Sequence, residues 1–141
     1  MAGLQIGMSI EAAEQSLREI PGFVPPVPGE SRNRGFAHYE SELSISVDFD
    51  SLGVVRAIEL FRPEKDVQVV FRGVNLFAES ANTVISQLAE MFHVEIEDGG
   101  LNITAPSVFI GLWRSVLPED SGGEEGWHFE SVIIAAPGYG S

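Results

Sequence analysis

Apolar residues recur at helical spacing in two segments of the chain. The first segment follows Ser9, a residue suited to cap a helix, and Pro21 and Gly22 end it. The second follows Asn75, which we take as its N-cap. The apolar stripes are Ile10, Ala13, Leu17 and Ile20 in the first segment, and Phe77, Ala81, Val84, Ile85, Leu88 and Phe92 in the second. The pattern therefore predicts two amphipathic helices.

Alternation of apolar and polar residues between Leu43 and Phe49 predicts a half-buried strand. Asp50–Gly53 is then expected to be a turn and Val54–Phe61 the returning strand, which together make a hairpin. Further strands are predicted in the segments VQVVFRG, VEIE, LNIT, SVFIGLWR and HFESVIIAA. In contrast, Pro21–Gly35 holds four prolines and three glycines, and this composition predicts a long crossing loop.

These elements predict an α+β fold in which two amphipathic helices cover one face of an antiparallel sheet. The motifs GMSI at Gly7–Ile10 and GVNL at Gly73–Leu76 each open a helix and lie about 66 residues apart. Each helix is followed by a strand-rich stretch. The pattern therefore indicates a single domain, residues 1–141, with a tandem helix-plus-meander duplication whose pseudo-repeats are 1–70 and 71–141.

Charge narrows the choice of partners. The chain has 21 Asp+Glu against 8 Lys+Arg, a net charge of −13. Residues 1–70 contain six basic and eleven acidic residues, and residues 71–141 contain two basic and ten acidic residues, so both halves are acidic. Nucleic acid and anionic membranes are disfavoured as partners, because proteins bind both mainly through Lys and Arg side chains. A basic protein would be attracted.

Composition also bears on compartment and chemistry. The chain has no cysteine, which excludes disulfides, thiolate metal sites and cysteine nucleophiles. The first residues form neither a basic leader nor an apolar stretch of signal-peptide length, so we expect a cytoplasmic protein. Neither a GxSxG nor an SxxK motif is found, and we expect no cofactor and no enzymatic activity.

One segment comes close to a calcium-binding loop. Counted from Asp48, an EF-hand would place oxygen ligands at Asp48, Asp50 and Glu59 and a glycine at Gly53, as found here. However, the fifth position is Leu52, and alternating strands flank the segment instead of helices. We therefore favour a β-turn capped by Asp50, with Gly53 at positive φ, and keep the three carboxylates only as weak metal candidates.

The three histidines, His38, His93 and His128, each lie near carboxylates in the sequence. In a strand, His93, Glu95 and Glu97 would share one face, which would suit a metal ion but is also typical of a solvated strand. Because the histidines lack the spacing that places ligands on one helical face, we do not predict a metal site there.

The segment PEDSGGEEG lies between the two tryptophans and is the best candidate for docking a basic surface. The partner-binding residues we predict are Glu119, Asp120, Glu124, Glu125 and Trp127. Trp113 and Trp127 either plug the rim of the core or anchor a partner, and we favour the plug.

Three resemblances support a protein-binding role. The segment IGMSIEAAEQSL resembles the helix opening of the small outer-membrane assembly lipoproteins, although the lipidation cysteine is missing here. The duplicated helix-plus-meander is similar to the β-lactamase inhibitory proteins. The stretch from FRGVNLFAESANTVISQLAE through LWRSVLPED to HFESVIIAAPGY resembles an uncharacterised family of small bacterial cytoplasmic proteins. These resemblances imply a fold and a habit of binding proteins, not an activity.

The leading hypothesis is therefore a non-catalytic protein that binds another protein through an acidic surface. Its sharpest version is an immunity or inhibitor protein that acts against a basic toxin or enzyme. The alternative is a metal-binding or small-molecule-binding domain of unknown role, and a homodimer formed through a sheet edge is a third hypothesis.

Overall fold

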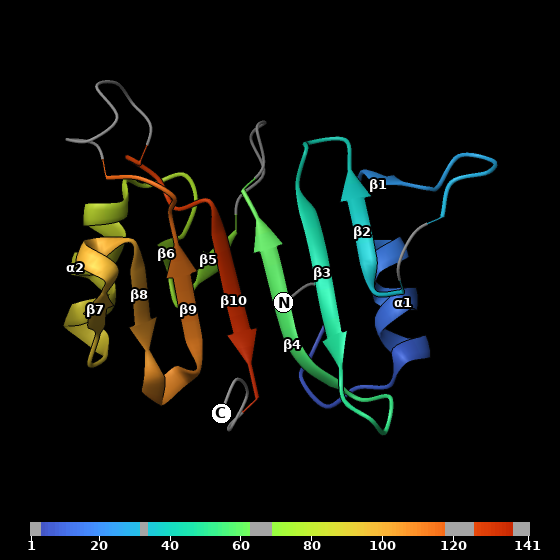
Figure 1. Cartoon of the computed structure of the whole chain (residues 1–141), viewed down its shortest axis with the longest axis horizontal. Coiled ribbons are helices and arrows are strands. Elements are labelled where there is room, and N and C mark those ends of the chain that lie inside the picture. Colours follow the sequence, from blue (N-terminus) through green and yellow to red (C-terminus); the bar gives the residue numbers. More distant parts are fainter. Residues whose placement is uncertain (1–3, 32–33, 63–68, 118–125, 137–141) are drawn as a thin grey trace. The chain divides into compact units, whose positions relative to one another are not determined.

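A computed structural model describes residues 4–31, 34–62, 69–117 and 126–136. It shows an α+β fold with two helices, eight strands of antiparallel sheet and a small hairpin. The chain divides into two compact units (Figure 1). The first unit comprises residues 1–66 and 134–141, and the second comprises residues 67–133.

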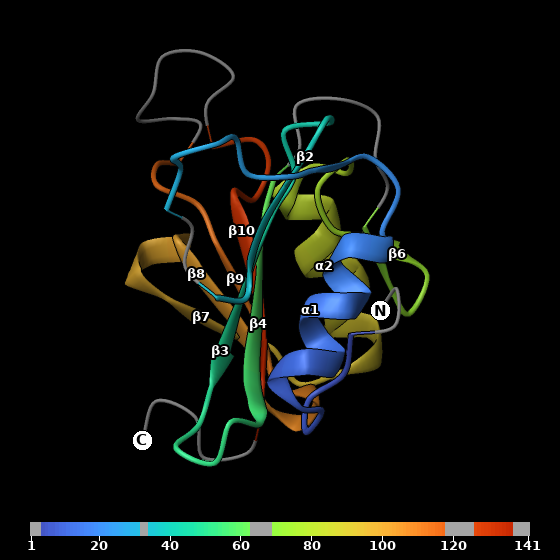
Figure 2. The same cartoon turned by 90° about the vertical axis from the view of Figure 1, so that its right-hand side faces the viewer.

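The first unit is one helix followed by a four-stranded antiparallel meander. Its strands pair in the order β1-β2-β3-β4, and Figure 2 shows α1 against one face of them. The elements are α1 (Ile10–Glu19), β1 (Phe23–Val24), β2 (Phe36–Tyr39), β3 (Ser44–Phe49) and β4 (Val55–Phe61).

Helix α1 begins and packs as its sequence predicts. The Ser9 side chain caps it by accepting a hydrogen bond from the Ala12 N–H at 3.2 Å. Ala13 and Leu17, from the predicted stripe, are buried. The Tyr39 hydroxyl donates to the Leu17 carbonyl at 2.7 Å and so joins the helix to β2. This carbonyl lies in the last turn of the helix, where backbone acceptors have no partner within the helix.

The predicted hairpin is confirmed between β3 and β4. Asp50 Oδ1 accepts hydrogen bonds from the N–H groups of Leu52 at 2.9 Å and Val54 at 3.0 Å. Gly53 has φ +77°, a backbone conformation that favours glycine. The core residues contributed by the two strands are Ile45, Val47, Val55, Ala57, Ile58 and Leu60.

The second unit again contains a helix followed by a meander. Within it the strands lie in the order β10-β9-β8-β7, and Figure 2 shows α2 on one side of its own strands. A separate hairpin precedes the helix. The elements are β5 (Val70–Phe71), β6 (Val74–Asn75), α2 (Ala81–Met91), β7 (Glu95–Glu97), β8 (Asn102–Ala105), β9 (Ile110–Trp113) and β10 (Ser131–Ala135), with short 3-10 turns at Asp98–Gly100 and Pro106–Val108. The last two residues of β10 belong to the first unit.

Helix α2 starts later than the sequence indicates, so the prediction of Asn75 as its cap is wrong. Asn75 ends β6, and its side chain accepts the Ala78 N–H at 3.2 Å in a turn. Ser80 is the actual N-cap and accepts the Thr83 N–H at 3.2 Å. Both side chains cap backbone N–H groups three residues ahead, and the sequence pattern does not distinguish which one continues into a helix.

The expectation of a crossing loop through Pro21–Gly35 is wrong at one point, because Phe23–Val24 forms β1. This strand pairs with β2, which the sequence analysis did not predict. In β2, Ala37 and Tyr39 are both buried, while Phe36 on the other face is half-buried and His38 is exposed. Apolar residues therefore occupy both faces, and the alternation that signals a strand is lost.

Both units thus place a helix before an antiparallel meander, while duplication of an ancestral unit stays a prediction. In the described residues, neither helix combines the length and the apolar character that crossing a membrane requires.

Candidate functional sites

Most of the predicted docking loop lies outside the described residues. This applies to Glu119, Asp120, Glu124 and Glu125. Trp127 is described, and its side chain is 51% exposed. Its carbonyl accepts the Ala81 N–H at 2.6 Å, which fixes its backbone at the start of α2.

The preference for tryptophans as plugs of the core is wrong. Trp113 is 42% exposed and Trp127 is 51% exposed. Phe129, two residues after Trp127, is instead fully buried, and the guanidinium of Arg114 lies 5.7 Å from the centre of its ring. Buried Arg114 also donates to the carbonyls of Gly100 at 3.0 Å and Gly126 at 2.8 Å. Arg114 and Phe129, and not the two tryptophans, are therefore the buried large side chains in this part of the second unit.

The sheet of the second unit has one face that α2 leaves open. Strand register places Glu97, Asn102 and Trp113 in one row across β7, β8 and β9. The neighbouring row is Glu95, Thr104 and Gly111. Ile103 and Leu112 point to the opposite face and are buried. We call the open surface the acidic face and define it by Glu95, Glu97, Asp98, Asn102, Thr104 and Trp113.

Polar contacts hold the carboxylates of the acidic face. Asn102 donates to Asp98, and the Thr104 hydroxyl donates to Glu97 at 3.4 Å. Glu95 lies 3.7 Å from exposed His93. Within the described ranges, no Lys or Arg forms a salt bridge with these carboxylates. Among the described residues, no Lys or Arg therefore offsets their negative charge by direct contact.

Two of the three calcium candidates are already engaged elsewhere. Asp48 accepts a hydrogen bond from Arg56 Nε at 2.8 Å, and Asp50 caps the hairpin turn. Glu59 lies on β4, opposite Ser46. Across the part of the chain that the structure describes, no group of three or more His, Asp or Glu side chains is arranged to hold a metal ion.

Sequence reasoning missed one polar pair, His38 and Ser44. The Ser44 hydroxyl and His38 Nδ1 are 2.8 Å apart across β2 and β3. The imidazole packs edge-on against Phe36, with 5.1 Å between ring centres. Among the described residues, no carboxylate is hydrogen-bonded to this histidine, as a catalytic serine–histidine pair would require. The contact instead provides the buried serine with a partner.

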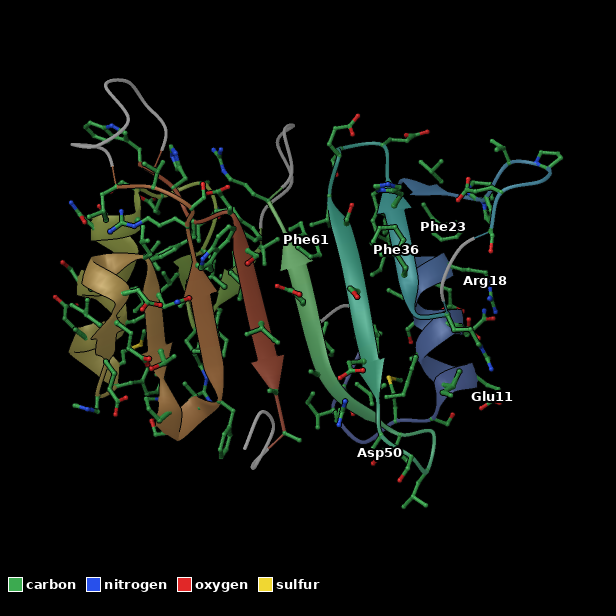
Figure 3. All side chains as sticks on the ribbon, in the orientation of Figure 1. Glu11, Arg18, Phe23, Phe36, Asp50 and Phe61 are labelled. Atoms are coloured by element: carbon green, nitrogen blue, oxygen red, sulfur yellow. The ribbon has the colours of Figure 1, made fainter. Side chains whose placement is uncertain are left out.

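A cleft of about 280 Å³ opens in the first unit, and sequence reasoning missed it as well. Its apolar walls are Leu17, Phe23, Pro25, Pro26, Phe36 and Ala37, and its charged groups are Glu14, Arg18 and Arg34. Figure 3 shows Arg18, Phe23 and Phe36 gathered at one edge of the unit, from α1, β1 and β2.

The charged groups of the cleft interact with one another. Arg34 forms a salt bridge with Glu14, and this hydrogen bond lowers the pKa of Glu14 below its usual value. The same contact raises the pKa of Arg34. Arg18 donates to Gln15 Oε1 at 3.0 Å. The cleft therefore carries two cations and one ionised carboxylate at neutral pH.

No protein-family model, no curated protein and no solved structure matches this chain. The resemblances to known families therefore remain proposals.

Proposed function

We propose that this chain is a non-catalytic protein that binds a basic protein partner through its acidic surfaces. The observation that carries the proposal is the acidic face, where Glu97 lies in the same row as Asn102 and the exposed Trp113. Among the described residues, no Lys or Arg forms a salt bridge with the carboxylates of this face. The predicted loop with Glu119, Asp120, Glu124, Glu125 and Trp127 would add to the same electrostatic attraction.

The chemistry of the face suits cationic side chains. Exposed tryptophan attracts Arg or Lys through the negative face of its ring. Glu95 and Glu97 would pair with neighbouring cations, and tryptophan is among the residues that most often dominate binding energy. The net charge of −13 would also speed association with a basic surface.

The sharpest form of the proposal is an immunity or inhibitor protein against a basic toxin or enzyme, acting in the cytoplasm. The architecture supports it, because a helix followed by an antiparallel meander occurs in both units. This is the arrangement that resembles the β-lactamase inhibitory proteins.

The test uses the full chain as bait in a lysate of its native host. A captured protein is identified, purified and titrated calorimetrically against wild type, against Glu95→Gln/Glu97→Gln and against Trp113→Ala. The matched control is Glu79→Gln/Glu90→Gln, which removes two exposed charges outside the acidic face.

We expect binding to weaken at least about tenfold in the two face variants and to stay within about twofold in the control. Raising the salt to about 0.5 M should weaken wild-type binding because it screens exposed charges. Equal losses in the face and control variants would contradict docking on the acidic face. Partner binding that is insensitive to salt would contradict the electrostatic basis.

The alternative is a metal-binding or small-molecule-binding domain. For metals, calcium, zinc and manganese can be tested by thermal shift, since a ligand at 100 times its dissociation constant adds about 2.7 kcal/mol of stability. We expect no shift because Asp48 and Asp50 already have intramolecular partners. For small molecules, the cleft of the first unit favours the alternative.

The homodimer hypothesis is tested by light scattering.

A further inference from the structure

The cleft in the first unit exists because a strand pair stops early. In the β1–β2 ladder, Phe23 is opposite Tyr39 and Val24 is opposite His38. Pro25 and Pro26 come next, and proline has no N–H to donate to a ladder. The chain therefore leaves β2 at the level of Ala37 and Phe36, and the space beside them becomes the cleft.

Helix α1 closes the other side. Glu14, Leu17 and Arg18 are three and four positions apart, so they lie on one face of the helix. Leu17 is buried at the base, whereas the Arg18 side chain is exposed. A ligand in the cleft would meet an apolar floor and a guanidinium at the rim.

The walls suit an apolar body. Phe23 is half-buried, so part of its ring is covered and part is accessible. Phe36 also lines the cleft, but its ring packs edge-on against His38 on the face of β2 opposite Ala37. The two prolines add rigid apolar surface without donors. A volume of about 280 Å³ is at the low end for small-molecule pockets, which favours a compact ligand.

The charge of the cleft selects an anion. Two arginines and one glutamate line it, which is an excess of one positive charge among the lining residues, and Glu11 also interacts electrostatically with Arg34. The Glu14 carboxylate occupies only part of the five-donor guanidinium of Arg34, and Arg18 is hydrogen-bonded to a neutral amide. Guanidinium groups match carboxylates in geometry and charge.

We propose that this cleft is a binding site for a small amphipathic carboxylate, whose apolar body packs against Phe23 and the two prolines and whose carboxylate is bound by Arg18. The site is formed by residues of α1, β1 and β2 together with Pro25, Pro26, Arg34 and Gly35, all within the first unit. It does not depend on partner docking at the acidic face.

The probe is 4-phenylbutyrate, with its uncharged amide as the matched ligand. Both are titrated into the full ¹⁵N-labelled chain, and amide chemical shifts report affinity and location together. The site predicts saturable binding of the acid with a dissociation constant at or below about 1 mM. It also predicts shift changes in α1, β1 and β2, and at least about tenfold weaker binding of the amide.

Two variants separate the site from general charge effects. Arg18→Gln should weaken binding of the acid at least about tenfold, because it removes one charge-assisted hydrogen bond. Arg72→Gln makes the same change at an exposed arginine of the second unit and should leave affinity unchanged. Both substitutions affect exposed side chains, so we expect the fold to remain intact.

Four results would each overturn the proposal. They are no saturation by the acid at millimolar concentration, equal affinity for acid and amide, equal losses in the two arginine variants, and shift changes that lie outside α1, β1 and β2.

Discussion

Tyr39 connects the helix and the sheet of the first unit through one buried hydrogen bond. Its hydroxyl donates to the Leu17 carbonyl at 2.7 Å, and its side chain is almost fully buried. Tyr39→Phe removes the donor and leaves the carbonyl without this partner. We expect unfolding free energy to fall by about 1–3 kcal/mol near pH 8, the usual cost of leaving one buried polar group unsatisfied.

Burial of the same side chain should make stability depend on alkaline pH. Burial raises the pKa of Tyr39 from 10.0 to about 12. In the unfolded chain the phenol ionises near its ordinary value, so the native state retains a proton that the unfolded state loses. The stabilisation is therefore complete below pH 10 and is lost as the pH rises to about 12. Two pKa units correspond to about 2.7 kcal/mol.

The assay is urea unfolding of wild type and Tyr39→Phe, followed by far-UV circular dichroism between pH 8 and pH 12. Groups that titrate in both proteins contribute equally to both free energies of unfolding, so their contributions cancel in the difference between wild type and variant. We expect the advantage of wild type to shrink steadily above pH 10 and to disappear by about pH 12. A difference that stays constant across this range would refute the reasoning.

Substitutions at three positions test other parts of the structure. Gly35→Ala should lower the free energy of unfolding by about 2–4 kcal/mol, because φ at Gly35 is +79° and a Cβ there would lie 2.7 Å from the Val47 carbonyl oxygen. A loss below about 1 kcal/mol in urea unfolding would contradict this. Arg114→Met should lower the free energy of unfolding by about 2–4 kcal/mol, because the buried carbonyls of Gly100 and Gly126 lose their donor. An unchanged melting temperature would show that these hydrogen bonds do not contribute to stability. Ser80→Ala removes the N-cap of α2 and should lower the free energy of unfolding by about 1 kcal/mol, whereas Ser80→Asp keeps a capping oxygen and should lower it much less. Equilibrium unfolding of the two variants measures this difference.

Some elements could be predicted because local and tertiary preferences agree. The β3–β4 hairpin has strict alternation, a capping aspartate and a glycine at positive φ, all within one short segment. Helix α1 has a cap, a stripe and a stop within twelve residues or so, and no competing cap precedes it.

Other features depend on contacts between distant residues. Strands β1 and β2 pair across a proline-rich segment, so their apolar residues follow no periodic pattern in the sequence. The cleft forms where this pairing stops. Likewise, the acidic face joins Glu97 to Trp113 through register across three strands, which sequence spacing alone does not reveal. Sequence spacing also does not reveal that Arg114 and Phe129 are buried while Trp113 and Trp127 are exposed.

The most direct test of partner docking is amide hydrogen exchange of the chain with and without its purified partner. The partner should slow exchange in β7 and β9 and around Trp113, because these strands carry the acidic face. Amides of α1 and of the β3–β4 hairpin should exchange at unchanged rates. Protection confined to α1 and that hairpin, with β7 and β9 unaffected, would contradict docking on the acidic face.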